Sequence, residues 1–118
     1  MLYSLIRSLK CRQVGQVQMQ ISVNGTAGTP VASGPDAAFI SSITDGGAGL
    51  YTIILKEPAK IAPFVSGIVP LTDKANGRVT ATTTSSITVQ FDASDTGAAL
   101  DADFNIQWQY SSQLSYYF

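Results

Sequence analysis

The chain has 118 residues, which is enough for one domain with its own core, and 45% of them are hydrophobic but only 13% charged. It has no histidine, the usual general acid-base and commonest metal ligand, and its single cysteine, Cys11, cannot form an internal disulfide. We therefore expect no enzymatic activity and no cofactor. No stretch approaches the roughly 20 apolar residues of a membrane span, and no secretory signal is expected.

Residues 1–13 are expected to form an N-terminal arm that precedes a single β domain over residues 14–118. The arm combines an apolar stripe at helical spacing, Leu2, Leu5, Ile6 and Leu9, with the bases Arg7, Lys10 and Arg12. It carries +3, whereas the four other bases and eight acids leave −4 for the rest of the chain. Because an isolated helix shorter than about 12 residues is marginal in water, the arm needs a host surface. We expect an acidic surface on a neighbouring subunit, to which the bases would steer the arm; the alternative is that residues 1–12 pack on their own domain.

From residue 14 the hydrophobic period changes from 3.6 to 2, which predicts strands. In chain order we expect a strand over 14–23, a loop over 24–36, a strand over 38–44, a turn over 45–47 and a central strand over 50–56. Residues 61–69 contain Pro63 and should form an edge strand or include a bulge. Asn76-Gly77 predicts a hairpin turn ahead of a strand over 78–83, and two more strands follow within 86–110.

These elements predict an all-β fold, either an antiparallel β-sandwich or a jelly-roll-like barrel, of about seven strands with the short arm in front. The expected core is Phe39, Ile53, Val89, Phe91, Phe104, Ile106 and Trp108.

The polar faces of the strands expected within 87–91 and 104–110 carry Thr, Gln and Asn where a solvated sheet would usually carry Lys and Glu. Such a face suits water, and it also suits another subunit, since an amide is buried more cheaply than a charge. We interpret the domain as a building block.

The only acidic cluster consists of Asp92, Asp95, Asp101 and Asp103. Oxygen ligands on a turn suit Ca²⁺, but the spacing does not match an EF-hand loop. The alternative is a solvated hairpin loop whose Asp residues cap turns. Nucleic acid is not an expected partner, because the three bases of the arm are few and the body is acidic.

The chain finishes with Leu114 and the aromatic run Tyr116, Tyr117 and Phe118. A terminal Phe after alternating apolar residues also ends bacterial outer-membrane barrels, but the strands are too irregular for lipid-facing bands, and no membrane partner is expected. We expect this tail to pack on its own domain or on a neighbour.

Four segments in this order resemble small β-sandwich modules of tailed-bacteriophage virion proteins: Gly49-Leu-Tyr-Thr-Ile-Ile-Leu55, the Pro-bounded residues 58–65, Ser86-Ile-Thr-Val-Gln-Phe-Asp92 and Asp103-Phe-Asn-Ile-Gln-Trp108. In those modules a Gly-x-Tyr-x-Ile strand precedes a Pro-containing strand, and the last strand follows an Asp-Phe pair. The resemblance covers about residues 38–110, and it is greatest to capsid decoration (cement) proteins.

The resemblance implies a structural virion protein that decorates and stabilises a phage capsid through protein-protein contacts. Its partners would be the major capsid protein or other virion subunits, and it would be made in the host cytoplasm and located on the capsid surface. It would form a homo-oligomer, with a trimer favoured. The arm and Tyr116, Tyr117 and Phe118 are the candidate contact residues. The alternative is the head of a fibre or spike that binds a host receptor or glycan.

Overall fold

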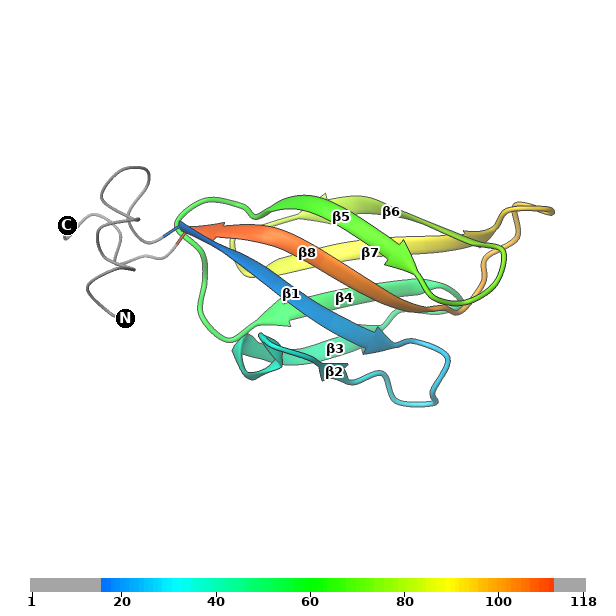
Figure 1. Ribbon diagram of the computed structural model, residues 1–118, viewed down its shortest axis with the longest axis horizontal. Coiled ribbons are helices and arrows are strands. Elements are labelled where there is room, and N and C mark those ends of the chain that lie inside the picture. The colour runs from blue at the N-terminus through cyan, green and yellow to red at the C-terminus, as the bar shows by residue number, and fades with distance from the viewer. Residues whose placement is uncertain (1–15, 112–118) are drawn as a thin grey trace.

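The computed structural model describes residues 16–111, which form an antiparallel β-sandwich of two four-stranded sheets. The first sheet has the order β2-β1-β8-β5, with β1 at Gln16–Asn24, β2 at Ala32–Ser33, β5 at Phe64–Pro70 and β8 at Asp103–Ser111. The second has the order β3-β4-β7-β6, with β3 at Ile40–Asp45, β4 at Leu50–Leu55, β6 at Ala75–Thr82 and β7 at Ser86–Ala93. Figure 1 shows β1, β8 and β5 crossing in front of β4 and β7.

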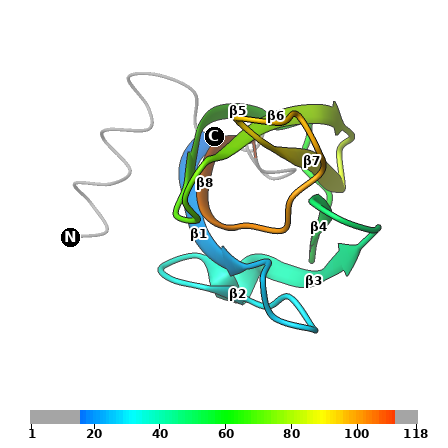
Figure 2. The same cartoon turned by 90° about the vertical axis from the view of Figure 1, so that its right-hand side faces the viewer.

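The edges of the two sheets approach one another on both sides. Strand β5 contacts β6, and β2 contacts β3, so the strands enclose the core almost as a barrel does (Figure 2). The prediction of an antiparallel sandwich with about seven strands is confirmed. The additional element is β2, two residues long, which pairs with β1 inside the segment expected to be a loop.

Aromatic side chains from both sheets meet in the core. Phe91 of β7 and Phe104 of β8 have ring centroids 4.6 Å apart, and Tyr51 of β4 lies 5.6 Å from Phe104. All three are fully buried, and together they join one sheet to the other. Six of the seven residues expected in the core are buried: Ile53, Val89, Phe91, Phe104, Ile106 and Trp108.

The seventh expected core residue, Phe39, is 54% exposed, so its assignment to the core was wrong. Residues 37–39 form a short 3-10 turn, and the strand begins only at Ile40. Because side chains alternate along a strand, this late start makes Ile40 the inward residue instead.

The expected hairpin turn at Asn76-Gly77 was also wrong, because both residues lie inside β6. Gly77 is opposite Phe91, and a Cβ at position 77 would collide with the Phe91 ring. This glycine therefore serves close packing in a strand interior. The chain turns earlier, at residues 72–74, where Lys74 has a φ of 63°.

Two further sequence expectations are confirmed. Strand β4 is central, between β3 and β7, and its outward residues are half-buried. Strand β5 is an edge strand with a bulge between Val65 and Gly67.

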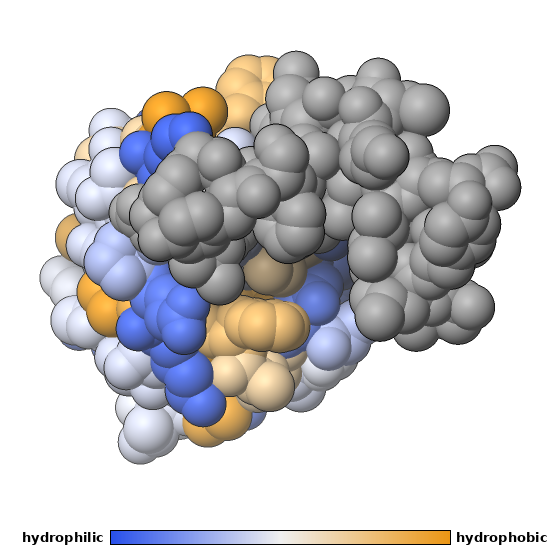
Figure 3. All heavy atoms as spheres, turned by 90° about the vertical axis from the view of Figure 1, so that its left-hand side faces the viewer, coloured by the Kyte–Doolittle hydropathy of each residue, from blue (hydrophilic) through white to orange (hydrophobic). Residues whose placement is uncertain are grey.

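One end of the sandwich holds both the first and the last of the described residues. Strand β1 begins and β8 ends at the same end, where Gln16 pairs with Ser111. Viewed from this end, apolar residues gather between hydrophilic ones (Figure 3).

Candidate functional site

The outer side of the β2-β1-β8-β5 sheet presents a row of side-chain amides. Strands β1 and β8 pair along their full lengths, and their buried residues, such as Ile21 and Ile106, alternate with outward polar ones. The outward residues face each other in the pairs Gln18 with Gln109, Gln20 with Gln107, and Ser22 with Asn105. We call this side of the sheet the amide face; it also includes Phe64, Ser66, Gly67 and Val69 of β5.

Some polar groups of the amide face bond to one another. Gln18 Nε2 donates to Ser66 Oγ at 3.0 Å, and Ser66 Oγ donates to the backbone carbonyl of Gln107 at 3.3 Å. Ser22 Oγ donates to Asn105 Oδ1. The side-chain amides of Gln20 and Gln107 have no hydrogen-bond partner within residues 16–111. These two groups can each donate and accept a bond from a partner molecule.

Charge is almost absent from this sheet. Among the strand residues that the structure describes, Asp103 at the start of β8 is the sheet's one charged side chain. Asp103 accepts hydrogen bonds from the backbone N–H (3.0 Å) and hydroxyl (2.8 Å) of Thr26, which places it at the edge of the amide face. A partner could therefore cover the centre of this face without burying an unpaired charge.

Apolar groups on β5 border the amides. Phe64 is 69% exposed and Val69 is 57% exposed, and they pair with Gln109 and Asn105 of β8. Between them, Gly67 leaves a shallow hollow of about 120 Å³, which Gln20, Asn105 and Gln107 also line. In the chain flanking β5, Ile61 and Leu71 are also exposed.

The edge of β5 is poorly suited to pairing with another strand. Pro63 precedes the strand, Pro70 ends it, and the bulge between Val65 and Gly67 interrupts its ladder. Prolines and bulges are common protections of edge strands. A partner is therefore expected to contact the side chains of the amide face rather than to extend the sheet.

The contact residues predicted from the sequence lie outside the described residues. They are Leu2, Leu5, Ile6, Arg7, Leu9, Lys10, Arg12, Tyr116, Tyr117 and Phe118. The sequence predicted uncharged polar faces on β7 and β8, but these strands belong to different sheets, and it is β1 that lies beside β8. The sequence did not reveal that Phe64 and Val69 join β1 and β8, although the absence of charge from residue 61 to 72 was a usable signal.

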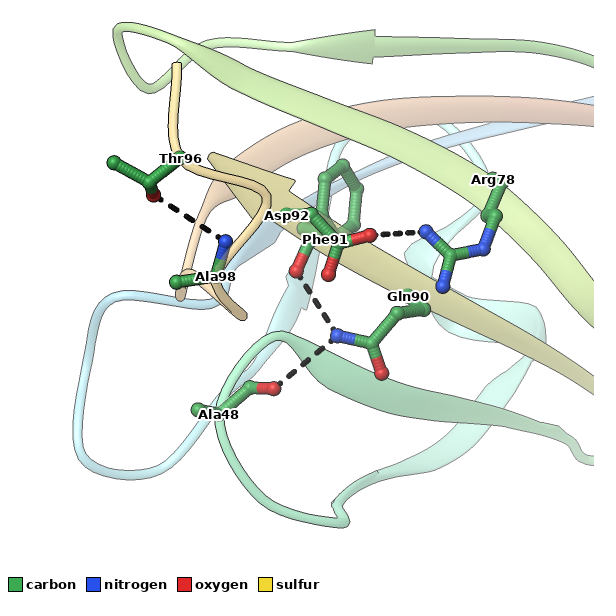
Figure 4. A network of polar contacts seen from close by, with 7 residues as sticks. All are labelled: Ala48, Arg78, Gln90, Phe91, Asp92, Thr96 and Ala98. Carbon is green, nitrogen blue, oxygen red and sulfur yellow. Dashed lines mark hydrogen bonds and ion pairs between the residues drawn. The ribbon is translucent and has the colours of Figure 1, made fainter. Parts of the chain in front are cut away.

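The acidic cluster is divided among separate partners. Asp92 forms an ion pair with Arg78 beside the bonds of Gln90 to the Ala48 and Phe91 carbonyls (Figure 4), and Asp95 lies 3.5 Å from Lys74 Nζ. Within residues 16–111, no group of three or more Asp, Glu, Cys or His side chains is placed to hold a metal ion.

Asp101, the next carboxylate of the cluster, is exposed and borders the buried hydroxyl of Tyr51. The Tyr51 hydroxyl donates to the Gly25 carbonyl at 2.9 Å, accepts from the Ala102 N–H at 3.2 Å, and lies 3.2 Å from Asp101 Oδ1. Burial, with the nearby Asp101 carboxylate as a lesser cause, raises the pKa of Tyr51 to about 12. These contacts tie together the loops at the end of the sandwich opposite the chain ends.

Comparisons of the chain with protein-family models, with curated proteins and with solved structures find no match. The resemblance to virion β-sandwich modules therefore stays a prediction. Within residues 16–111 there is no helix of the length and apolarity needed to cross a membrane.

Proposed function

We propose that this protein is a non-enzymatic structural subunit of a tailed-bacteriophage particle. It decorates and stabilises the capsid, and its partner is the major capsid protein or another virion subunit. The observation that carries the proposal is the amide face, a sheet surface with unpartnered Gln amides, exposed Phe64 and Val69, and no charge at its centre.

A partner covers an uncharged surface at a lower cost in free energy than a charged one. The cores of protein interfaces are depleted of charged residues, because a charge without a partner loses its hydration. Gln20 and Gln107 can exchange hydrogen bonds with a partner's backbone, and Phe64 and Val69 supply apolar area near the same hollow. An exposed surface of this composition is typical of a protein contact rather than of a solvated sheet.

The resemblance also implies association between copies, with a trimer favoured. Residues 16–111 carry four bases and eight acids, a net charge of 4 − 8 = −4, so copies of the domain repel one another. The amide face is where two copies could approach with the fewest like charges in contact. Light scattering at high concentration tests this association, and a monomer that also fails to bind capsids would refute the proposal.

The test of the amide face uses particles that lack the protein. In the variant Gln20→Lys/Gln107→Lys, two ammonium groups stand at the centre of the face. Binding to particles should weaken by at least about a hundredfold, because an unpaired buried charge costs about 3–5 kcal/mol.

The matched control is Ser42→Lys/Thr44→Lys, which adds the same charge to exposed positions of edge strand β3 on the other sheet. This control should bind particles as the natural chain does. Equal weakening in both variants would mean that net charge, not the amide face, governs binding.

A second candidate function is the fibre or spike head that binds a glycan. The hollow beside Gly67 favours it, because Gln20, Asn105 and Gln107 offer hydrogen-bonding groups suited to neutral sugar hydroxyls, and Phe64 lies on the same face. Binding to a glycan array that Gln107→Lys abolishes, without binding to capsids, would favour this function over decoration.

A further inference from the structure

A pocket of about 350 Å³ lies at the end of the sandwich where β1 begins and β8 ends. Met19, Leu55 and Trp108 contribute buried side chains to it, and Phe39 and Tyr110 contribute partly exposed ones. The wall is completed by Ala38, Lys56 and Glu57. Figure 3 shows this end, with apolar residues gathered between hydrophilic ones. The pocket is therefore an opening into the apolar core.

Three groups at the pocket are left unpaired or uncovered by residues 16–111. The indole N–H of Trp108 is buried without a hydrogen-bond acceptor, the Glu57 carboxylate has no ion pair among the described residues, and Phe39 is 54% exposed. A buried N–H without an acceptor is uncommon in folded proteins. An occupant with an apolar side chain, a carbonyl oxygen and a positive charge would match all three groups.

The negative charge of Glu57 acts at the pocket itself. The Tyr110 hydroxyl lies 3.4 Å from the backbone carbonyls of both Glu57 and Pro58. Burial, and then the nearby Glu57 carboxylate, raises the pKa of the Tyr110 hydroxyl. Lys56 also lines the pocket, so Glu57 would contribute a local contact rather than a broad acidic field.

The chain ends leave the sandwich beside this pocket. Fifteen residues precede Gln16 and seven follow Ser111, and these two residues pair with each other. Only the N-terminal segment combines aliphatic residues with positive charge, in Leu2, Leu5, Ile6 and Leu9 with Arg7, Lys10 and Arg12. The C-terminal seven residues contain no charged side chain.

We propose that this pocket is the docking site of the chain's own N-terminal arm. Aliphatic side chains of the stripe enter between Phe39, Leu55 and Trp108, and a basic side chain of the arm pairs with Glu57. Met19 is three residues from Gln16 in β1, about 10 Å along the strand, whereas the seven residues from Leu9 to Gln16 reach roughly 23–25 Å when extended. The arm is thus long enough to fold back onto the pocket.

Docking within one molecule is favoured over docking on a neighbour. A short linker gives an attached segment an effective concentration in the millimolar range, far above the concentration of free subunits in most solutions. The docked stripe also gains the host surface that an isolated helix of this length lacks.

The direct test is nuclear magnetic resonance of the full chain. Trp108 is the only tryptophan, so its indole signals are unambiguous. We expect nuclear Overhauser contacts from the methyl groups of Leu5, Ile6 or Leu9 to the Trp108 ring. Contacts from Leu114 instead, or no contact from either segment, would overturn the proposal.

A mixture of isotope-labelled and unlabelled chains separates the molecule's own arm from a neighbour's. Contacts that persist only within labelled chains are expected. Contacts seen between labelled and unlabelled chains alone would overturn the assignment to the chain's own arm.

Two matched variants test the pocket independently of the amide face. Phe39→Glu should abolish the contacts between arm and indole, whereas Phe64→Glu, at another exposed phenylalanine, on β5, should keep them. Both changes are at exposed side chains, so both variants should fold. Arm contacts that survive Phe39→Glu would overturn the proposal. Loss of particle binding in Phe64→Glu alone would concern only the proposed function.

Discussion

The outer faces of the two sheets differ in where their polar groups find partners. On the β3-β4-β7-β6 sheet, the hydroxyls of Thr52 and Thr88 lie 3.2 Å apart and bond each other, and Thr80 Oγ1 donates to the Thr88 carbonyl. On the amide face, Gln20 and Gln107 stand opposite each other without a hydrogen bond between their side chains. Short hydroxyl side chains are satisfied within their own face, whereas the longer amides of this pair are left for a partner.

The largest effect on stability is expected where the two sheets are fixed to each other. Tyr51 stands on the inner side of the threonine-bearing sheet, and its hydroxyl bonds to Gly25 and Ala102 in loops next to β1 and β8. Tyr51→Phe leaves these backbone groups unpaired, so the free energy of unfolding should fall by about 1–3 kcal/mol. Urea denaturation measures the change. As a control, Tyr110→Phe, whose hydroxyl has only 3.4 Å contacts, should cost less.

The same hydroxyl should make stability depend on alkaline pH. Because burial raises the pKa of Tyr51 from 10.0 to about 12, the folded chain holds this proton more tightly than the unfolded chain. The resulting stabilisation is complete below pH 10 and is lost as the pH rises through about 12. The raised pKa of Tyr110 acts in the same direction. The thermal midpoint of Tyr51→Phe should therefore fall less over this range than that of the natural chain, and an identical fall would contradict the assignment.

The same glycine-to-alanine substitution should reduce stability to different extents on the two sheets. At Gly77, on the inner side of β6, a Cβ collides with the buried Phe91 ring, so Gly77→Ala should destabilise the fold by about 1–3 kcal/mol. At Gly67, on the amide face, a Cβ meets only the end of the Gln107 side chain at 3.2 Å, which can move away. Gly67→Ala should change stability by less than about 0.5 kcal/mol. Equal losses in thermal unfolding would show that the amide face is packed as tightly as the core.

The smallest expected effect is the coupling within each face. A double-mutant cycle of Thr52→Val and Thr88→Val should give a coupling energy of about 0.2–1 kcal/mol, since these side chains bond each other. The equivalent cycle of Gln20→Ala and Gln107→Ala should give a coupling near zero. A strong coupling between the glutamines would mean that the amides are satisfied by each other and are not free for a partner.

The alternation of apolar and polar residues was sufficient to predict β1, β4, β7 and β8 and six core residues. It succeeded because a half-buried strand imposes a period of two over many residues. It failed at Phe39, where a 3-10 turn delays the strand, and at Asn76-Gly77, where a turn-forming pair lies inside β6. A local turn overrides the pattern at Phe39, and close packing against Phe91 overrides it at Gly77. Neither cause can be read from the neighbouring residues in the sequence.

The candidate site was only partly predictable. The uncharged polar face of β8 was predicted from the sequence, but the pairing of β8 with β1 and the addition of Phe64 and Val69 depend on sheet order. The pocket near Trp108 was not predicted, because it is formed by residues from the ends of β1, β4 and β8 and from the turn before β3.

The central claim is that the amide face binds the capsid. Cryo-microscopy of intact particles that carry the protein tests it most directly, because the sandwich can be oriented from its two unequal sheets. We predict that the β2-β1-β8-β5 sheet faces the shell, with Gln20, Gln107 and Phe64 at the contact. A sandwich that contacts the shell through the β3-β4-β7-β6 sheet would contradict the claim, and so would particles that show no density for the protein.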